Sequence, residues 1–304
     1  MKAVGRLREK RYFSKPVRLG VIGGSGLYEM EGCRLLRELS VKTPFGPPSD
    51  RIAIVDVGGE PVAFLPRHGR GHRISPSEIN VRANIFALKS LGVEQLISVG
   101  AVGSLKEELA PTHLILPDQL VDKTRCRVQT FFRGGIVAHV QFDQPYCPHL
   151  RSLLAESARE SALDVHEDGI YVCMEGPAFS TKAESLEHRR LGYSVVGMTA
   201  LPEAKLAREA VLCAANVSFV TDYDCWKEGE EAVTAERVIS NLKEGVSRAQ
   251  KLLRAALPIL AARGRSGVCR CPHALAGAIV TDPRLINRAA ARKLGLLIAK
   301  AINI

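Results

Sequence analysis

Short apolar runs alternate with amphipathic segments along most of the chain. The apolar run at residues 18–22 ends in glycines, which predicts a buried strand followed by a tight loop. Two further runs between residues 51 and 65 flank Gly58-Gly59, a pair typical of a hairpin turn. The same pattern predicts strands within residues 94–105, 112–122, 169–180, 194–198 and 214–226.

Helical periodicity occupies the stretches between these strands. Residues 75–92 contain a serine as an N-cap candidate, apolar residues at helical spacing and Gly92 as a stop. Further helices are predicted within residues 148–163, 199–210, 231–262 and 283–302. Strands that alternate with helices predict an α/β fold, here a single-domain mixed twisted sheet surrounded by helices. In such sheets ligands bind at the carboxyl ends of the strands, where the glycine-rich stretches of this chain fall.

No flexible linker and no internal repeat divides the chain. We therefore expect a basic arm at residues 1–17 and one domain over residues 18–304, whose last part, residues 268–304, holds a C-x-C motif and a terminal helix. The 304 residues are 46% hydrophobic, which is enough for a large core. No stretch approaches the roughly 20 apolar residues of a membrane helix, and the basic arm lacks the apolar region of a secretory signal. The expected location is the cytoplasm.

The net charge of +10 fits two kinds of partner, a nucleic acid or small anions. The basic residues are scattered, apart from the N-terminal arm and residues 284–300. No basic strand is interleaved with aromatic residues, as a base-stacking surface requires. The pattern favours a protein that handles small anions, and it predicts neither a nucleic acid nor a membrane as partner.

Six of the eight cysteines lie far apart in regular segments, so we expect them to be reduced, isolated core thiols. Only Cys269 and Cys271 are clustered, with His273 close by. A single C-x-C without a second pair and without a fourth ligand is weak evidence for zinc. The sequence therefore predicts two thiols or a labile disulfide there, and no metal site.

Two loops carry candidate anion-binding groups. The stretch GVIGGSGL at residues 20–27 matches neither a dinucleotide-binding nor a Walker A motif, and it fits either an anion nest that includes Ser25 or a plain turn. In PRHGRGHR, residues 66–73, Arg67 could hold an oxyanion in a bidentate fork, with His68 as a further donor. The glycines between His68 and His72 argue against a helix that aims both at one metal ion. The second loop therefore predicts an anion site.

Three later stretches add candidate ligand contacts. Phe179, after a Gly-Pro turn, could cover a ring, Met198 could supply an apolar contact, and Thr199 could present its hydroxyl and helix amides to an anion. Packing in the core is the alternative for each of them. Asp222 and Asp224 follow a buried strand, and a D-x-D pair can bind either a metal with a nucleotide diphosphate or the edge of a base.

Taken together, these motifs resemble those of the purine nucleoside phosphorylase superfamily, and within its trimeric class the methylthioadenosine phosphorylase family. The tail CRCPHALAGAIVTDP resembles the prokaryotic branch. The matching stretches span residues 17–260 in the family's order; they are GVIGGSGL, TPFGPPSD, RHGRGH, ANIFALKSLG, GAVGSL, MEGPAFSTKAES, GMTALPEAKLAREA and TDYDCWKEGEEAV. The resemblance implies a nucleoside phosphorylase-like fold and the attack of inorganic phosphate on C1′ of 5′-methylthioadenosine.

The resemblance also implies residue roles. Phosphate would be bound by Ser25, Arg67, His68, Gly100, Ala101 and Thr199. The nucleoside would contact Met198 under the ribose, Phe179 against the purine, Asp222 and Asp224 at the adenine edge, His72, and His139 near the 5′ group. A neighbouring subunit of a trimer, or of a dimer of trimers, would supply part of this pocket. Animal enzymes have threonine where this chain has Gly100, so only a backbone N–H can serve there.

Physical chemistry fits this reaction without a metal or cofactor, with phosphate as the co-substrate. The phosphate dianion stabilises the positive charge that develops on the sugar, and Asp222 can protonate N7 of the leaving purine, with Asp224 beside it. The 6-oxopurine enzymes carry Asn at position 222, Glu at 180 and His at 238, whereas this chain has Asp222, Ser180 and Val238. Ala235 and Val238 suggest an apolar slot for a methylthio group. These differences favour methylthioadenosine over the alternatives: a 6-oxopurine or methylthioinosine phosphorylase, or a broad enzyme that also uses adenosine.

Overall fold

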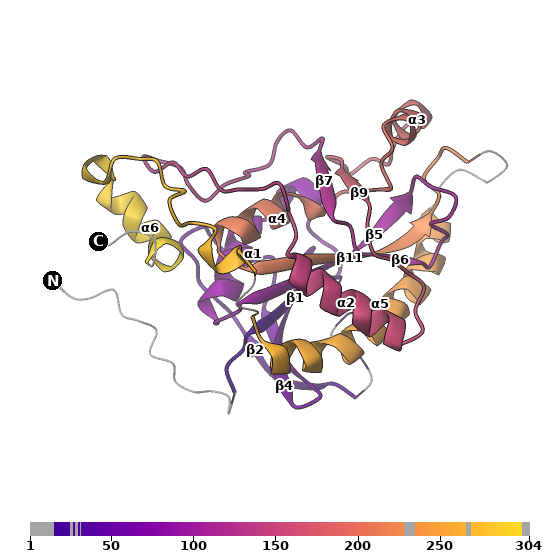
Figure 1. The fold of residues 1–304 in the computed structure, drawn as a ribbon, viewed down its shortest axis with the longest axis horizontal. Coiled ribbons are helices and arrows are strands. Elements are labelled where there is room, and N and C mark those ends of the chain that lie inside the picture. Colours follow the sequence, from indigo (N-terminus) through magenta and orange to yellow (C-terminus); the bar gives the residue numbers. More distant parts are fainter. Residues whose placement is uncertain are drawn as a thin grey trace.

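Eleven strands form one mixed sheet in the computed structural model (Figure 1), which describes residues 15–24, 27, 30, 32–227, 235–265 and 269–299. The main order is β2-β3-β4-β1-β5-β10-β9-β7; β11 pairs with β5 and β6, and β6 pairs with β8. The strands are β1 (Leu19–Gly23), β2 (Arg34–Leu39), β3 (Ile52–Val57), β4 (Glu60–Pro66), β5 (Gln95–Ser104), β6 (Leu114–Ile115), β7 (Gln119–Asp122), β8 (Val165–His166), β9 (Ile170–Cys173), β10 (Val195–Gly197) and β11 (Cys213–Asp222). The predicted α/β class and mixed sheet are confirmed.

The hairpin predicted around Gly58-Gly59 is present as β3 and β4. Both glycines have positive φ, 61° and 83°, which side-chain-bearing residues rarely adopt, so the pair can turn the chain between the strands. The carboxylate of Asp56 accepts a hydrogen bond from the Gly59 N–H at 2.7 Å and supports the turn.

β5 is longer than the sequence predicts. Within residues 94–105 the sequence predicts a strand that runs into a glycine-bearing loop, yet the strand continues to Ser104 because both flanks remain paired. On one side β11 runs parallel to it as far as Gly103. On the other side β10 runs antiparallel to its last residues, with Val196 opposite Gly103. The glycine-bearing end of β5 is therefore a rigid part of the sheet.

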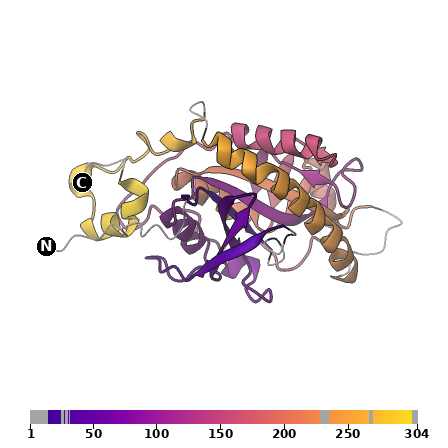
Figure 2. The same ribbon diagram turned by 90° about the horizontal axis from the view of Figure 1, so that it is seen from below.

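Helices cover both faces of the sheet (Figure 2), with α2 beside α5 on one face and α1 beside α4 on the other. Figure 1 shows α6 and α3 at opposite ends of the molecule. Of the helices that the structure describes, none combines the length and the apolar character needed to cross a bilayer. Their bounds are α1 (Val81–Ser90), α2 (Pro148–Glu160), α3 (Lys182–Arg190), α4 (Ala200–Glu209), α5 (Ala235–Arg263) and α6 (Arg288–Ile298).

The start of α1 differs from the prediction. Ser75 does not cap this helix; it precedes a separate 3₁₀ turn at Pro76–Glu78. The N-cap of α1 is Asn80, whose side-chain oxygen accepts a hydrogen bond from the Ala83 N–H at 3.2 Å. Ser75 and Asn80 are both capping residues and lie only five positions apart, so the sequence pattern alone does not show which of them begins α1.

β11 runs through the centre of the core and is buried along its whole length. Its alternate residues pack on opposite faces: Val217 and Phe219 lie with α2 and α5, whereas Ala214 lies with α1 and α4. A strand covered on both faces presents a continuous apolar run, and this explains why the sequence predicts it clearly. Its carboxyl end, where the charged residues begin, is thereby fixed in position.

The sequence predicted isolated cysteines, but the structure brings four of them together. The thiols of Cys147, Cys213, Cys269 and Cys271 converge, with the four sulfur atoms within 4.8 Å of one another. The expectation that the C-x-C motif lacks further ligands is therefore wrong. The segments that bring the two additional thiols are more than 50 residues away in sequence, so local spacing gives no sign of the cluster.

Candidate active site

The carboxyl ends of four neighbouring strands meet at one edge of the sheet. β1 runs parallel to both β4 and β5, and β5 runs parallel to β11. The loops after β1 and β4, the end of β5 and the residues after β11 therefore open on the same side. This is the edge at which open α/β sheets bind ligands.

Gly100 and Thr199 lie against each other at this edge. β10 leads the chain back along β5, so that a side-chain Cβ at Gly100 would lie 3.3 Å from the hydroxyl oxygen of Thr199. Thr199 is the N-cap of α4, but its side chain makes no capping hydrogen bond. The Thr199 N–H donates to the Tyr171 hydroxyl at 3.4 Å, and the non-helical Leu201, followed by Pro202, breaks the first turn of α4. The polar group that the structure places beside Gly100 is therefore the Thr199 hydroxyl and not a regular helix N-terminus. We call this region the anion end of the site.

Asp222 and Asp224 lie three residues further along β5, at Gly103. A Cβ at Gly103 would be 3.1 Å from Oδ1 of Asp222 and 3.3 Å from Cβ of Asp224. Asp222 is only 8% exposed; Oδ2 accepts a hydrogen bond from the Thr221 hydroxyl at 2.7 Å, and Oδ1 accepts one from the Asp224 N–H at 2.8 Å. We call this region the carboxylate end.

A carboxylate oxygen of Asp224 is a buried hydrogen-bond acceptor. Its Oδ2 has no hydrogen-bond partner among the described residues, and its backbone is in the left-handed region with φ of 53°. Leaving such a group unpaired costs about 1–3 kcal/mol. Strain and an unsatisfied acceptor in one residue at a strand end are typical of a group that is satisfied by a ligand.

The two ends of the site are separated by a distance that suits a nucleoside. Three residues of a strand from Gly100 to Gly103 span about 10 Å. An anion at one end and a nitrogen-rich base at the other would leave the intervening length for a sugar. Glycine at both positions lets polar side chains from neighbouring strands approach the backbone of β5.

The loop after β9 borders this surface. A Cβ at Gly176 would be 2.5 Å from the sulfur of Met198, so Met198 packs directly on that glycine. Phe179 is 54% exposed and stands free of the core, where its ring can cover a ligand. The carbonyl of Ser180 accepts a hydrogen bond from the Cys225 thiol at 3.3 Å, which places Ser180 beside the carboxylate end.

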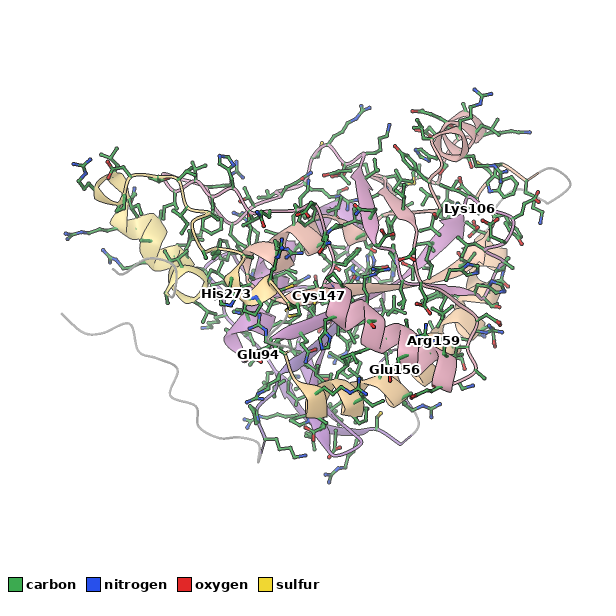
Figure 3. All side chains as sticks on the ribbon, viewed as in Figure 1. Glu94, Lys106, Cys147, Glu156, Arg159 and His273 are labelled. Carbon is green, nitrogen blue, oxygen red and sulfur yellow. The ribbon has the colours of Figure 1, made fainter. Side chains whose placement is uncertain are left out.

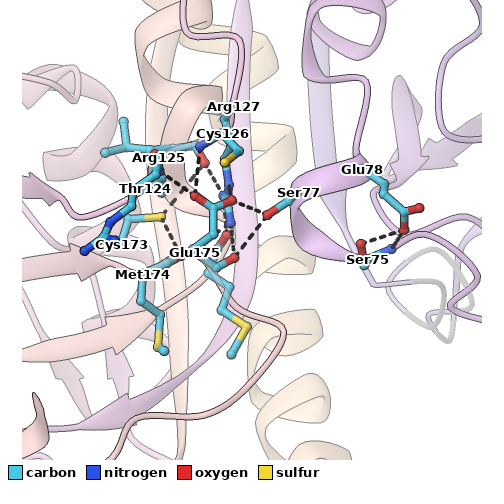
Figure 4. Close-up of polar contacts among 12 residues, drawn as sticks. Ser75, Ser77, Glu78, Thr124, Arg125, Cys126, Arg127, Cys173, Met174 and Glu175 are labelled. Atoms are coloured by element: carbon cyan, nitrogen blue, oxygen red, sulfur yellow. Dashed lines mark hydrogen bonds and ion pairs between the residues drawn. The ribbon is translucent and has the colours of Figure 1, made fainter.

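Glu175 and Arg127 form a supporting network that the sequence did not reveal (Figure 4). The Arg127 side chain, 4% exposed, donates to the carbonyls of Met198 and Leu201 at 2.6 Å each and pairs with Glu175 at 3.2 Å. Burial raises the pKa of Glu175, but hydrogen bonds from Ser77, two backbone amides and Arg127 outweigh it and lower the pKa to about 2. The ion pair fixes the loop that carries Met198. Its partners lie about 48 residues apart, so no local motif predicts it.

The Arg67 guanidinium, which we expected to hold an anion, is paired with other groups of the protein, so its contact with phosphate stays a prediction. That side chain is turned inward and the residue is only 2% exposed. Nε and Nη2 donate to the two carboxylate oxygens of Glu203 at 2.5 and 3.0 Å, Nη2 also to the Ser98 hydroxyl at 2.8 Å, and Nη1 to the Val99 carbonyl at 3.0 Å. Arg67 therefore joins the ends of β4 and β5 to the first turn of α4, and Glu203 neutralises its charge.

His68 is held as a neutral donor-acceptor ring. Its Nδ1 lies 2.8 Å from the Ile74 carbonyl and donates to it, and its ring stacks at 4.2 Å on the exposed His72. Burial and the Arg67 charge lower the pKa of His68 to about 4, although the bond to Ile74 opposes them. At neutral pH its Nε2 is therefore an acceptor, which can accept a hydrogen bond from a protonated phosphate oxygen. As the structure stands, the Arg67 charge is paired with Glu203 and the His68 ring is neutral.

This lowered pKa predicts how stability depends on pH. Folding opposes protonation of His68, so its contribution to stability is fully present above pH 6.5 and is lost as the pH falls towards 4. Between pH 6.5 and pH 4 the wild type should lose unfolding free energy as His68 becomes protonated. We expect His68→Gln, which keeps a donor for the Ile74 carbonyl, to lose about 1–2 kcal/mol less over the same pH range. Urea unfolding at pH 7, 5.5 and 4.5 measures it, with His139→Gln, at another exposed histidine, as control. Parallel pH profiles for His68→Gln and the wild type would refute the prediction.

The remaining predicted residues fall into three groups. Ala101 lies on β5 next to Gly100 and pairs with Phe219. His139 is exposed and lies on the segment between β7 and α2, where its N–H donates to the Ala278 carbonyl at 2.8 Å. The structure therefore places His139 with the C-terminal segment. Ser25 lies outside the described residues, as do the side chains of Ala235 and Val238 at the beginning of α5.

The chain belongs to the phosphorylase superfamily, whose family model matches residues 18–258. That range includes the mixed sheet and both the anion end and the carboxylate end of the site. Within that class it is a member of the methylthioadenosine phosphorylase family, as its relatives show. An S-methyl-5'-thioadenosine phosphorylase of Geobacter sulfurreducens is 48% identical over 93% of this chain and 99% of its own length. One from Chloroflexus aurantiacus is 52% identical over 91% and 95%.

Solved structures agree with these relatives. A methylthioadenosine phosphorylase sourced from an antarctic soil metagenomic library has a TM-score of 0.87 and 42% identity, covering 93% of this chain and 99% of its own. The methylthioadenosine phosphorylase of Schistosoma mansoni in complex with adenine has a TM-score of 0.79 and 32% identity, covering 95% and 100%. The similarity thus extends over the sheet and both ends of the site.

Proposed function

We propose that this chain catalyses the phosphorolysis of S-methyl-5'-thioadenosine to adenine and 5-methylthioribose 1-phosphate. The observation that carries the proposal is the pair Asp222 and Asp224 at Gly103, with a buried acceptor of Asp224 left for a ligand donor. An amine at C6 is the donor that adenine offers, whereas a 6-oxopurine has a carbonyl oxygen at that position. The sequence relatives carry the name of this activity.

In the proposed mechanism, an oxygen of phosphate at the anion end attacks C1′ of the nucleoside. The C1′–N9 bond breaks and its electron pair passes to the purine, whose N7 takes the proton of Asp222, while Asp224 accepts from the 6-amino group. Because Glu203 pairs with Arg67 and His68 is neutral, the phosphate keeps its negative charge. That charge stabilises the positive charge that develops on the sugar.

A substrate panel tests this function. Adenine release from methylthioadenosine should require phosphate and should exceed release from adenosine, and methylthioinosine and inosine should be cleaved more slowly. Faster cleavage of the 6-oxopurines would favour the alternative, a 6-oxopurine or methylthioinosine phosphorylase, and equal rates would indicate broad specificity. We propose that the reaction uses no cofactor and no metal at Asp222 and Asp224, so brief treatment with EDTA should leave the initial rate unchanged.

Two glycines give a separable test of the two ends. Gly100→Ala places a methyl group 3.3 Å from the Thr199 hydroxyl, and Gly103→Ala places one 3.1 Å from Asp222. We expect the first to raise KM for phosphate and the second to raise KM for the nucleoside, each by roughly ten- to a hundredfold if about 1.4–2.7 kcal/mol is lost. Steady-state kinetics with each substrate varied in turn measures this. Each variant serves as the other's control, and equal effects on both KM values would refute the division.

We also propose that the enzyme is a homo-oligomer, a trimer or a dimer of trimers, in which His139 contributes to the pocket of a neighbour. This is supported by the exposure of His139 and by its hydrogen bond to the C-terminal segment at Ala278. The cytoplasmic location and the absence of nucleic-acid and membrane partners stay predictions.

Subunit mixing tests the role of His139. We expect His139→Ala to raise KM for methylthioadenosine while phosphate KM changes little. If His139 acts across an interface, mixed oligomers of His139→Ala and the inactive Asp222→Asn subunits should regain activity, because some sites combine two intact halves. If subunits have exchanged and the activity of the mixture is only the sum of the two variants' activities, His139 acts in its own subunit's site or in no site. Light scattering gives the oligomeric state.

A further inference from the structure

Four thiols gather at the start of β11, the end of that strand opposite to Asp222. Cys147, Cys213 and Cys271 are buried and Cys269 is half-buried, and their sulfur atoms lie within 4.8 Å of one another. Cys213 Sγ and Cys269 Sγ lie 3.3 Å apart. Figure 3 locates the cluster through Cys147, at the beginning of α2, and His273, two residues beyond Cys271.

The cluster has the geometry of a tetrathiolate site. Four sulfurs at 2.3 Å from a central Zn²⁺ are about 3.8 Å from one another in a tetrahedron. Separations from 3.3 Å to 4.8 Å bracket that value, so small side-chain movements suffice. We propose that Cys147, Cys213, Cys269 and Cys271 bind one thiophilic metal ion, Zn²⁺, in a closed structural site.

Three separate segments are held in place to form the site. Cys147 is the N-cap of α2, and its N–H donates to the Ala214 carbonyl at 2.7 Å, which fixes it beside Cys213 at the start of β11. Cys269 and Cys271 come from the segment after α5, where Cys271 begins a 3₁₀ turn. Ligands from three elements are positioned by regular structure, as a structural metal site requires.

Charge favours a metal over neutral thiols or disulfides. A Zn²⁺ ion with four thiolates carries two net negative charges. The buried Arg208 donates from Nη1 to Cys271 Sγ at 3.8 Å, and the Arg265 side chain hydrogen-bonds Cys213. The Nε of Arg265 is buried without a partner among the described residues. Both guanidinium groups also donate to backbone carbonyls, of Gln144 and Val211, but a carbonyl carries no net charge, so a dianionic metal centre would balance the two cations and neutral thiols or disulfides would not.

The position assigns the ion a structural role. Cys213 and Asp222 are the two ends of β11, about 30 Å apart for a strand of this length. The metal would tie the C-terminal segment to β11 and α2. The Ala278 carbonyl of that segment accepts a hydrogen bond from the His139 N–H. The metal site would therefore also stabilise the surface on which His139 lies. It acts independently of the proposed catalytic chemistry.

Metal analysis of the full chain, purified with reductant from zinc-supplemented cells, tests the proposal. We expect one zinc per chain, released stoichiometrically when an organomercurial titrates the thiols. Cys269→Ser and Cys271→Ser should lose it, and Cys33→Ser, outside the cluster, should keep it. Metal retained by Cys269→Ser would overturn the proposal, as would a metal-free protein whose unreduced mass shows these four cysteines in disulfides.

A second measurement covers variants that fail to fold. The wild-type chain, exchanged with Co²⁺, should show the thiolate charge-transfer and tetrahedral ligand-field bands of a four-sulfur site, and their absence would contradict it. Loss of the metal should lower the melting temperature and expose the C-terminal segment to protease, while kcat of surviving enzyme stays near the wild-type value. Because metal content is read without a substrate, a failure of the proposed catalytic function would leave this test unaffected.

Discussion

Asp222→Asn is expected to lower kcat/KM for methylthioadenosine by about 10³–10⁴-fold, because it removes the group that protonates N7. Asparagine can keep both local hydrogen bonds of Asp222: its oxygen can accept from the Asp224 N–H, and its amide can donate to the Thr221 hydroxyl. The fold should therefore survive, and the melting temperature should change little. Stopped assays of adenine release measure the loss.

The substrate dependence of this loss gives the control. An amide at position 222 can donate to a 6-oxygen or to N7, so the loss on methylthioinosine should be much smaller than the loss on methylthioadenosine. Asp224→Asn should weaken nucleoside binding more than kcat, since Asp224 is proposed to accept from the amino group and not to transfer the proton. Near wild-type activity of Asp222→Asn on methylthioadenosine would end the assignment of Asp222 as the acid.

Arg67→Met is expected to destabilise the protein by about 3–5 kcal/mol, because it leaves the carboxylate of Glu203 buried without its partner. The double variant Arg67→Met with Glu203→Leu removes both charges, so it should recover most of that stability. A residual cost of about 1–2 kcal/mol is expected from the unpaired Ser98 hydroxyl and Val99 carbonyl. Urea unfolding of the three variants and the wild type completes the cycle.

The same double variant decides what Arg67 does for phosphate. If Arg67 positions the strands and does not touch the anion, a stable double variant should raise phosphate KM only modestly. If the guanidinium turns out of its pocket to grip phosphate, the stable double variant should lose phosphate binding while nucleoside binding persists. This second result would restore the direct role that the sequence suggested.

The sequence predicted the parts of the fold that have a local signature. The apolar run of β11 and the Gly58-Gly59 hairpin were found because burial and turn geometry act on neighbouring residues. The second half of β5 was missed because its glycines resemble a loop, and only pairing with β10 and β11 keeps it extended. The sequence pattern singled out Thr199, Asp222 and Asp224 as candidate ligand contacts, Gly100 was added by the family resemblance, and the structure places these residues along the same strand edge.

The sequence could not predict contacts between distant side chains. The pair Arg67–Glu203 joins residues 136 positions apart, and nothing near Arg67 indicates that it turns inward. The support of Met198 by Arg127, and the approach of Cys147 and Cys213 to the C-x-C motif, also arise only after the sheet has formed. Ser25 and the side chains of Ala235 and Val238 lie outside the described residues, so their roles stay predictions.

The most direct measurement is a crystal structure of the enzyme with adenine and phosphate. We expect N7 and the 6-amino group of adenine within about 2.7–3.2 Å of carboxylate oxygens of Asp222 and Asp224. The phosphate should contact the Thr199 hydroxyl and the backbone at Gly100, with the Arg67–Glu203 pair intact. Adenine bound away from the end of β11, or a phosphate held by the Arg67 guanidinium after that pair has opened, would contradict this account.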